Sequence, residues 1–428
     1  MKSRDQQYLK DTLQENEQTI SAAASAPKIH PLGILFSLAS GLLFAWYAFF
    51  QITIPLVGKE FGYSPLSIAL IGSATNIATI CAPLIYTTLA FYARSVFWSM
   101  FSSVLLGSII LGIAYYRDFN ELELFSILLV AAILIQGPVA LLEISILKLT
   151  ENNIFRFAHI RIWGSIGFAI AIFIFSWALN NWHLAGALAV QMIICICSAL
   201  VLISLKKHLR SIDPKGRYQK NLFEFLYELT KHPQFILTTA IATLHWISIF
   251  GVYSFLPIHL ANTGWDNQEI SQVWAISIGC EVIMFILYDK LFRDVTPKKT
   301  LMIALLGTAI RWPLLGVNFS AILVGIGFAL HAFSISIFLL ANRVLSRLTL
   351  PEEIRDRGQG VHTAISVGIG SLIGRFIAAE EIRLLGGYSY FFEVTLFFTI
   401  FSACALLLSS KLAKDLPYNE RKIKIAKS

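Results

Sequence analysis

The sequence predicts an all-α polytopic membrane protein with twelve transmembrane helices in two six-helix bundles. Of its 428 residues, 56% are hydrophobic and only 14% are charged, whereas soluble domains carry about 25% charged residues. A soluble core of this size could not bury so much apolar surface. Since only helices and closed barrels satisfy backbone polar groups in lipid, and these apolar runs are long and continuous, we expect helices.

The apolar runs have the length of about 20 residues that crosses a bilayer. We expect spans at residues 32–55, 66–90, 95–115, 122–147, 157–179, 184–205, 235–259, 270–289, 300–317, 319–341, 358–380 and 388–410. The ninth and tenth of these are separated by almost nothing.

The placement of lysine and arginine supports this count. Of the 34 Lys and Arg residues, 29 lie in segments assigned to the inner side, three lie in outer loops, and Arg311 and Arg375 lie within spans. By the positive-inside rule, this bias predicts that both termini are cytoplasmic. The net charge of +8 therefore reflects topology and is poor evidence for nucleic-acid binding.

The longest internal loop divides the spans six and six. The expected regions are a cytoplasmic tail at 1–31, an N-terminal bundle at 32–205, a basic cytoplasmic linker at 206–234, a C-terminal bundle at 235–410 and a cytoplasmic tail at 411–428. Such an organisation is typical of transporters built from two parallel halves. All five cysteines lie inside apolar spans, without the loop placement of a disulfide framework or a thiolate metal site.

Polar side chains form a stripe along each of the first two spans. The first span carries Ser40, Phe44, Tyr47 and Gln51 on one helical face, and the second carries Ser73, Asn76 and Thr79. Stripes of this kind would line an aqueous path. Hydrogen bonding between packed helices accounts for each stripe equally well.

The fourth and fifth spans carry opposite charges. Glu143 lies near the inner end of the fourth span, and Arg161, Ser165 and Phe168 form one stripe on the fifth. By position alone, Arg161 is equally an ordinary arginine at the membrane boundary. Glu143 favours an intramembrane ion pair, because each charge would lower the burial cost of the other. Gly164 and Gly167 beside this stripe are expected to allow close helix packing.

Three consecutive later spans each hold an ionisable residue, namely Glu281, Arg311 and His331. A charge at the centre of a bilayer costs about 2.5–3.5 kcal/mol, so such residues are rare and usually functional. We expect these spans to surround a polar cavity, with Trp274 on the face of Glu281. In this cavity two acids balance two arginines, which leaves His331 to titrate.

Other charged residues in the second half have simpler explanations. Arg375, Glu380, Glu381 and Arg383 gather near the outer end of one span, where we expect interfacial pairing. Arg343 begins a charge run that we interpret as solvated. His245 is expected to be a packed, hydrogen-bonded histidine.

With these residues, the chain resembles the major facilitator superfamily, in the branch of MFS_1-like transporters that contains lactose permease and phenylpropionate permease. Glu143 and Arg161 match a Glu–Arg pair on helices four and five of that branch, and Glu281, Arg311 and His331 match a Glu, an Arg and a His on helices eight to ten. The run Arg-Ile-Trp-Gly-Ser at 161–165 is similar to a phenylpropionate-permease motif. In comparison with lactose permease, Phe168 replaces a sugar-stacking tryptophan and Ser334 replaces an acid.

The resemblance implies a secondary active transporter of the bacterial inner membrane, which moves a small organic solute by alternating access, with proton-coupled symport as the expected mechanism. The substrate classes left open are an aromatic acid, a sugar and a nucleoside. The expected substrate-binding residues are Glu143, Arg161, Ser165, Phe168, Tyr47, Gln51 and Trp274, and the expected proton-coupling residues are Glu281, Arg311 and His331. Glu281 is the first candidate for the proton carrier.

Other functional classes stay open. A solute receptor or sensor with the same fold would bind without transport, and an exchanger or efflux antiporter would use the same cavity. A membrane-embedded enzyme would need a nucleophile–base or metal constellation, whereas the histidines here are scattered over several spans. The expected partners are the solute, a proton and the lipid bilayer, with a monomeric chain, no cofactor and no nucleic acid.

Overall fold

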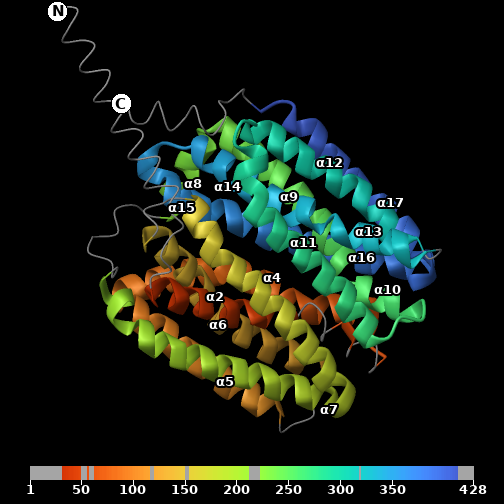
Figure 1. Cartoon of the computed structure of the whole chain (residues 1–428), viewed down its shortest axis with the longest axis horizontal. Coiled ribbons are helices and arrows are strands. Elements are labelled where there is room, and N and C mark those ends of the chain that lie inside the picture. The colour runs from red at the N-terminus through yellow and green to blue at the C-terminus, as the bar shows by residue number, and fades with distance from the viewer. Residues whose placement is uncertain are drawn as a thin grey trace, which may run out of the picture.

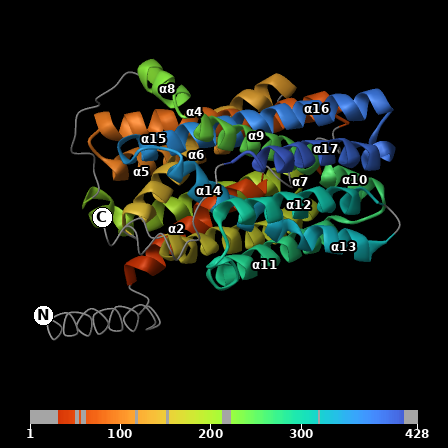
Figure 2. The same ribbon diagram turned by 90° about the horizontal axis from the view of Figure 1, so that it is seen from above.

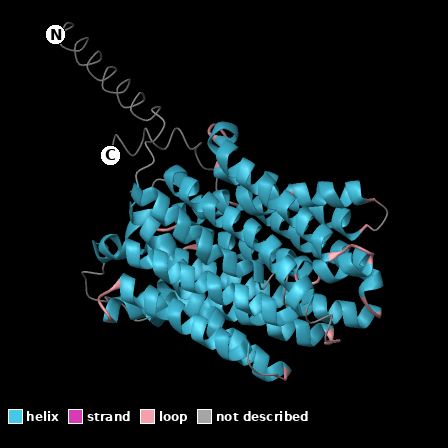
Figure 3. Ribbon diagram, turned by 60° about the horizontal axis from the view of Figure 1, so that its bottom comes forward, coloured by secondary structure: helices cyan, strands magenta, loops and turns pink. Residues whose placement is uncertain are grey.

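The computed structural model describes residues 31–49, 55–56, 62–115, 120–149, 154–211, 222–317 and 320–412. Within these ranges the regular elements are helices, and no strand is present (Figure 3). The long helices run roughly side by side along the long axis of the molecule (Figure 2). The expectation of an all-helical fold is therefore confirmed for the described part of the chain.

The first half of the chain forms one group of helices, drawn from red to yellow-green in Figure 1. It consists of α2 (Pro31–Ala48), α4 (Pro65–Tyr92), α5 (Val96–Tyr115), α6 (Glu121–Leu149) and α7 (Ile154–Ser211). Two helices are merged in α7, because His183 inside it has φ 53° and ψ −152°, which are not helical values. This kink falls between the fifth and sixth predicted spans.

The second half forms the neighbouring group, drawn from green to blue in Figure 1. Its α-helices are α8 (Leu222–Thr230), α9 (Pro233–Tyr253), α10 (Leu256–Asn262), α11 (Asn267–Phe292), α12 (Pro297–Gly316), α13 (Ala321–Ala329), α14 (Phe338–Leu348), α15 (Glu352–Thr363), α16 (Gly370–Leu385) and α17 (Phe391–Ser409). Two π-helical turns, η2 (Phe333–Ile337) and η3 (Ala364–Ile369), and a 3-10 turn, η4 (Tyr388–Tyr390), complete it.

Eight helical segments within the described ranges are long and apolar enough to cross a membrane, and two shorter apolar helices accompany them. One of the eight, His159–Ser211, contains the kink at His183 and covers two predicted spans. Every predicted span overlaps a helix. The number of twelve crossings and the boundaries of the two bundles stay predictions.

The two groups of helices meet along two seams. At one seam α7 packs against α11, and at the other α4 packs against α16 and η3. We refer to them as the α7–α11 seam and the α4–α16 seam. Each seam thus joins an early helix to a late one, so that polar residues which face it lie close to the other half of the chain.

Glycine allows a close helix contact in the first half. A Cβ atom on Gly167 of α7 would overlap the backbone of Gly41 on α2, and one on Gly164 would meet the side chains of Phe44 and Arg161. The expectation that these glycines permit close packing is confirmed. Since the obstacle at Gly167 is backbone, it cannot be relieved by a change of rotamer.

We expect Gly167→Ala to lower the free energy of unfolding by about 1–3 kcal/mol, the usual cost of forcing an extra carbon into a packed contact. The matched control is Gly279→Ala, since Gly279 is exposed on α11 and nothing lies within 4 Å of its Cβ position. Reversible unfolding in mixed micelles measures both variants. Equal stability of the two alanine variants would contradict the α2–α7 contact.

Candidate functional site

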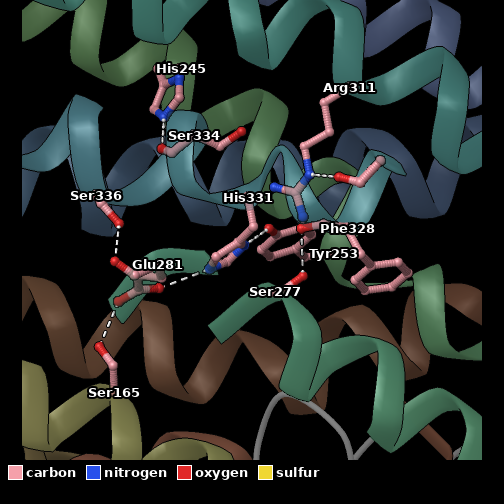
Figure 4. A network of polar contacts seen from close by, with 11 residues as sticks. Ser165, His245, Tyr253, Ser277, Glu281, Arg311, Phe328, His331, Ser334 and Ser336 are labelled. Atoms are coloured by element: carbon pink, nitrogen blue, oxygen red, sulfur yellow. Dashed lines mark hydrogen bonds and ion pairs between the residues drawn. The ribbon is translucent and has the colours of Figure 1, made fainter. Parts of the chain in front are cut away.

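The carboxylate of Glu281, on α11, is buried between the two halves of the chain. Only 5% of this residue is exposed. Its Oε1 accepts a hydrogen bond of 2.6 Å from the Ser165 hydroxyl on α7, and its Oε2 lies 2.9 Å from Nε2 of His331 (Figure 4). Each carboxylate oxygen thus has one partner, and the two partners come from different halves.

His331 connects this carboxylate to a tyrosine. Its Nδ1 lies 2.5 Å from the hydroxyl of Tyr253, at the end of α9. A neutral imidazole donates from one nitrogen and accepts at the other, so His331 donates to Glu281 when it accepts from Tyr253. Tyr253, His331 and Glu281 therefore form one continuous hydrogen-bonded chain through the C-terminal half.

The π-helical turn η2 begins two residues after His331. Ser336 of η2 donates a hydrogen bond of 3.1 Å to the backbone carbonyl of Glu281, which ties α11 to this turn. His245 lies 2.9 Å from the backbone carbonyl of Ser334 and stacks on Phe338 at 3.6 Å, as expected for a packed histidine. π-Helical turns inside α-helices occur frequently at functional sites.

Ser334 does not join the Glu281 network. Its hydroxyl accepts a hydrogen bond of 3.1 Å from Thr308 on α12. The position that carries an acid in lactose permease is thus occupied here by a neutral link between α12 and η2. Any proton route through this site has to depend on the remaining groups.

Arg311, on α12, is fully buried, and no carboxylate of the described residues lies at ion-pair distance from it. Its Nε donates a hydrogen bond of 2.7 Å to the carbonyl of Gly327, and its guanidinium carbon lies 4.9 Å from the ring centre of Tyr253. The two terminal nitrogens have no hydrogen-bond partner among the described residues. Cation–π contact with the ring supplies part of the missing stabilisation. The group beside Glu281 is His331, whereas Arg311 lies over Tyr253, and the overall balance of two acids and two arginines stays a prediction.

Glu143, on α6, bridges two arginines. Its Oε1 lies 3.3 Å from Nε of Arg161 on α7, which confirms the expected ion pair. Its Oε2 lies 3.4 Å from Nη2 of Arg343 on α14. The interpretation of Arg343 as part of a solvated charge run is therefore wrong. Its side chain is only 15% exposed, because it reaches across to the other half.

The other expected substrate-binding residues are placed unevenly. Ser165 belongs to the Glu281 network, and the buried ring of Trp274 packs edge-on against Tyr253 at 4.9 Å. Phe168 is half-buried and packs against the hydrophobic core. Tyr47 lies in α2, but its side chain lies outside the described residues, as does the whole of Gln51.

Arg375, on α16, makes a polar contact between helices that the sequence did not predict. It is 4% exposed, and its Nε donates a hydrogen bond of 3.1 Å to the side-chain oxygen of Asn76 on α4. The expected pairing near the outer end holds for Arg383 with Glu380, but it is wrong for Arg375. Asn76 belongs to the polar stripe of the second span, which was the available signal for this contact.

Comparisons with known proteins agree on one family. The model of the MFS_1 like family matches residues 36–394. The maltose permease of Geobacillus stearothermophilus is 21% identical over 375 residues, which cover 86% of this chain and 92% of that protein. The "probable 3-phenylpropionic acid transporter" of Escherichia coli is 26% identical over 145 residues, 34% of this chain and 38% of that one.

The fold has solved counterparts. The crystal structure of an aspartate-to-alanine mutant of the nucleoside transporter NupG aligns with a TM-score of 0.77 over 90% of this chain and 100% of that one. With 18% sequence identity, this likeness shows the fold alone.

We expect Glu143 and Arg343 to be energetically coupled across the two halves. In a double-mutant cycle with Glu143→Gln and Arg343→Gln, contacting charges give a coupling free energy of about 0.5–3 kcal/mol in unfolding experiments. The control cycle uses Glu380 and Arg383, a pair exposed on one helix, for which we expect no measurable coupling. Additive effects at Glu143 and Arg343 would show that their contact contributes nothing.

Proposed function

The chain belongs to the MFS_1 like family of multi-pass membrane transporters, and we propose that it is a proton-coupled symporter of a small organic solute. The family membership makes it a transporter rather than an enzyme. The single observation that carries the proposal is the buried chain Tyr253–His331–Glu281, which ends on Ser165 of the other half.

The carboxylate of Glu281 is the group that carries the proton. An ionised carboxylate accepts short, charge-assisted hydrogen bonds, about twice as strong as neutral ones. Ionised Glu281 therefore holds Ser165 firmly, and its protonation weakens this bond. Since Ser165 and Glu281 face each other at the α7–α11 seam, the proton affects the contact between the two halves. This links protonation to alternating access by rocking of one half against the other.

His331 supplies the second titratable position of the chain. Imidazole is the side chain best suited to accept or release a proton near neutral pH, and here it lies within hydrogen-bond distance of both Glu281 and Tyr253. A proton that enters at Tyr253 reaches Glu281 through the ring. Arg311 lies over the Tyr253 ring and sets the electrostatic potential at this end of the chain.

The path of the solute between the halves includes contacts with Glu143 and Arg161. The guanidinium of Arg161 stacks on the Phe44 ring at 3.6 Å, while its ion pair with Glu143 holds it in place. The proposed lining also includes Ser165, Phe168, Trp274, Tyr47 and Gln51. The names of the relatives mention maltose, 3-phenylpropionic acid and a nucleoside, which correspond to the sugar, aromatic-acid and nucleoside classes.

We assign the protein to a bacterial inner membrane, with both termini in the cytoplasm and with bundles at residues 32–205 and 235–410. The excess of lysine and arginine in the segments assigned to the inner side supports this orientation.

Glu281→Gln is expected to abolish proton-driven accumulation, because the amide cannot carry the proton, while solute counterflow survives. Accumulation is measured as uptake into proteoliposomes with an imposed pH gradient, over a panel of aromatic acids, sugars and nucleosides. Counterflow is measured as solute exchange without a gradient. Glu393→Gln is the control, since this carboxylate is exposed at the start of α17. Undiminished active uptake by Glu281→Gln would remove Glu281 from the mechanism.

A further inference from the structure

The interior of the described helices contains more positive than negative charge. The fully buried acidic and basic side chains of the described residues, histidines aside, are Glu281, Arg311 and Arg375, and Glu143, Arg161 and Arg343 form a half-buried cluster. Glu143 is shared by two of the arginines, and Glu281 is held by a histidine. Arg311 and Arg375 therefore have no carboxylate at ion-pair distance among the described residues. Because an unpaired buried charge is costly, this excess favours the entry of an anion.

Of these two arginines, Arg375 is the less enclosed. Arg311 has no exposed surface and is enclosed by Tyr253, Trp312 and the Gly327 carbonyl. Arg375 is 4% exposed, and its described contacts are one hydrogen bond through Nε and the Phe250 ring at 5.7 Å. Its two terminal nitrogens make no hydrogen bond within the described ranges. A guanidinium in this state offers the planar fork that matches a carboxylate.

The surroundings of Arg375 supply further donors. Gly72 of α4 lies directly against the guanidinium, so that any side chain at this position would collide with it. Ser371, one helical turn before Arg375 and on the same face of α16, has a buried hydroxyl with no partner among the described residues. Asn76 accepts from Arg375 through its oxygen, which leaves its NH2 group as a further donor.

We propose that Arg375, Ser371 and Asn76 form an anion site at the α4–α16 seam, and that this site binds a carboxylate group of the transported solute. The proposal rests on the proposed function, since it names the class of solute that the transporter carries. It selects an organic acid over a neutral sugar or a neutral nucleoside.

Binding at this site also acts on the contact between the halves. Arg375 belongs to the second half and Asn76 to the first, so their hydrogen bond crosses the seam. A carboxylate offers stronger, charge-assisted bonds to the guanidinium than the amide oxygen does. The incoming solute therefore competes with the side-chain oxygen of Asn76 for Arg375, and its arrival loosens the α4–α16 seam.

The test measures the thermal stability of the purified full chain in detergent, because a ligand that binds the folded state raises the melting temperature. The probes are acetate, benzoate, 3-phenylpropionate and galacturonate, each with its neutral counterpart acetamide, benzamide, 3-phenylpropionamide or galactose, and chloride at matched ionic strength. We expect at least one acid to stabilise the protein, with little effect of its neutral counterpart or of chloride.

Arg375→Gln is expected to weaken binding of that acid by about 10- to 100-fold, the usual effect of losing hydrogen bonds to a charged group. Arg383→Gln is the control, since Arg383 is an exposed arginine of the same helix, paired with Glu380. If Arg375→Gln fails to fold, Arg375→Lys keeps the charge without the fork, and it is expected to fold and to bind the acid more weakly. Acid binding with unchanged affinity in the lysine variant then overturns the proposal.

Three further results overturn the proposal. In the first, no acid raises the melting temperature more than its neutral counterpart does. In the second, chloride raises it as much as the acid does. In the third, Arg375→Gln binds the acid with unchanged affinity. Transport assays distinguish a failure of the anion site from a failure of the proposed transport function. Proton-driven uptake of a neutral solute, without any acid effect, refutes the anion site alone. Acid binding without uptake refutes the transport function alone.

Discussion

The burial of the Glu281 carboxylate is the constraint on which the rest of the site depends. A charge removed from water is tolerated only when hydrogen bonds and opposite charges replace its hydration. Here one oxygen is satisfied by Ser165 and the other by His331. Since neither half of the chain supplies both partners, the stability of this charge requires the two halves to stay together. The same requirement makes the contact sensitive to a proton.

The two seams share one principle. At each of them, a charged group of the second half bonds a neutral group of the first, Glu281 with Ser165 and Arg375 with Asn76. Breaking a buried ion pair leaves two unpaired charges, whereas exchanging a neutral partner for water, a proton or a solute costs much less. Such contacts suit a protein whose halves separate in every transport cycle. The Glu143–Arg343 pair, which is less deeply buried, adds a third link between the halves.

The sequence predicted what depends on one helix or on two helices that are consecutive in the chain. The apolar runs located the helices, and the acid on the fourth span correctly indicated an ion pair with Arg161. Partners between distant helices were not predictable in the same way, because spacing along one helix does not identify the helix opposite. Arg343 and Arg375 were therefore misread as solvated and interfacial residues. The π-helical turn η2, whose Ser336 bonds the backbone carbonyl of Glu281, also has no clear signal in the sequence.

The central claim is that solute movement and proton movement are one process through Glu281 and His331. It is tested most directly by recording the internal pH of proteoliposomes that contain the purified protein, when a solute shown to bind it is added outside without an imposed gradient. The account predicts that the solute drives protons inward and acidifies the interior. Binding of the solute without any change in pH would contradict the account and indicate a receptor or an uncoupled carrier.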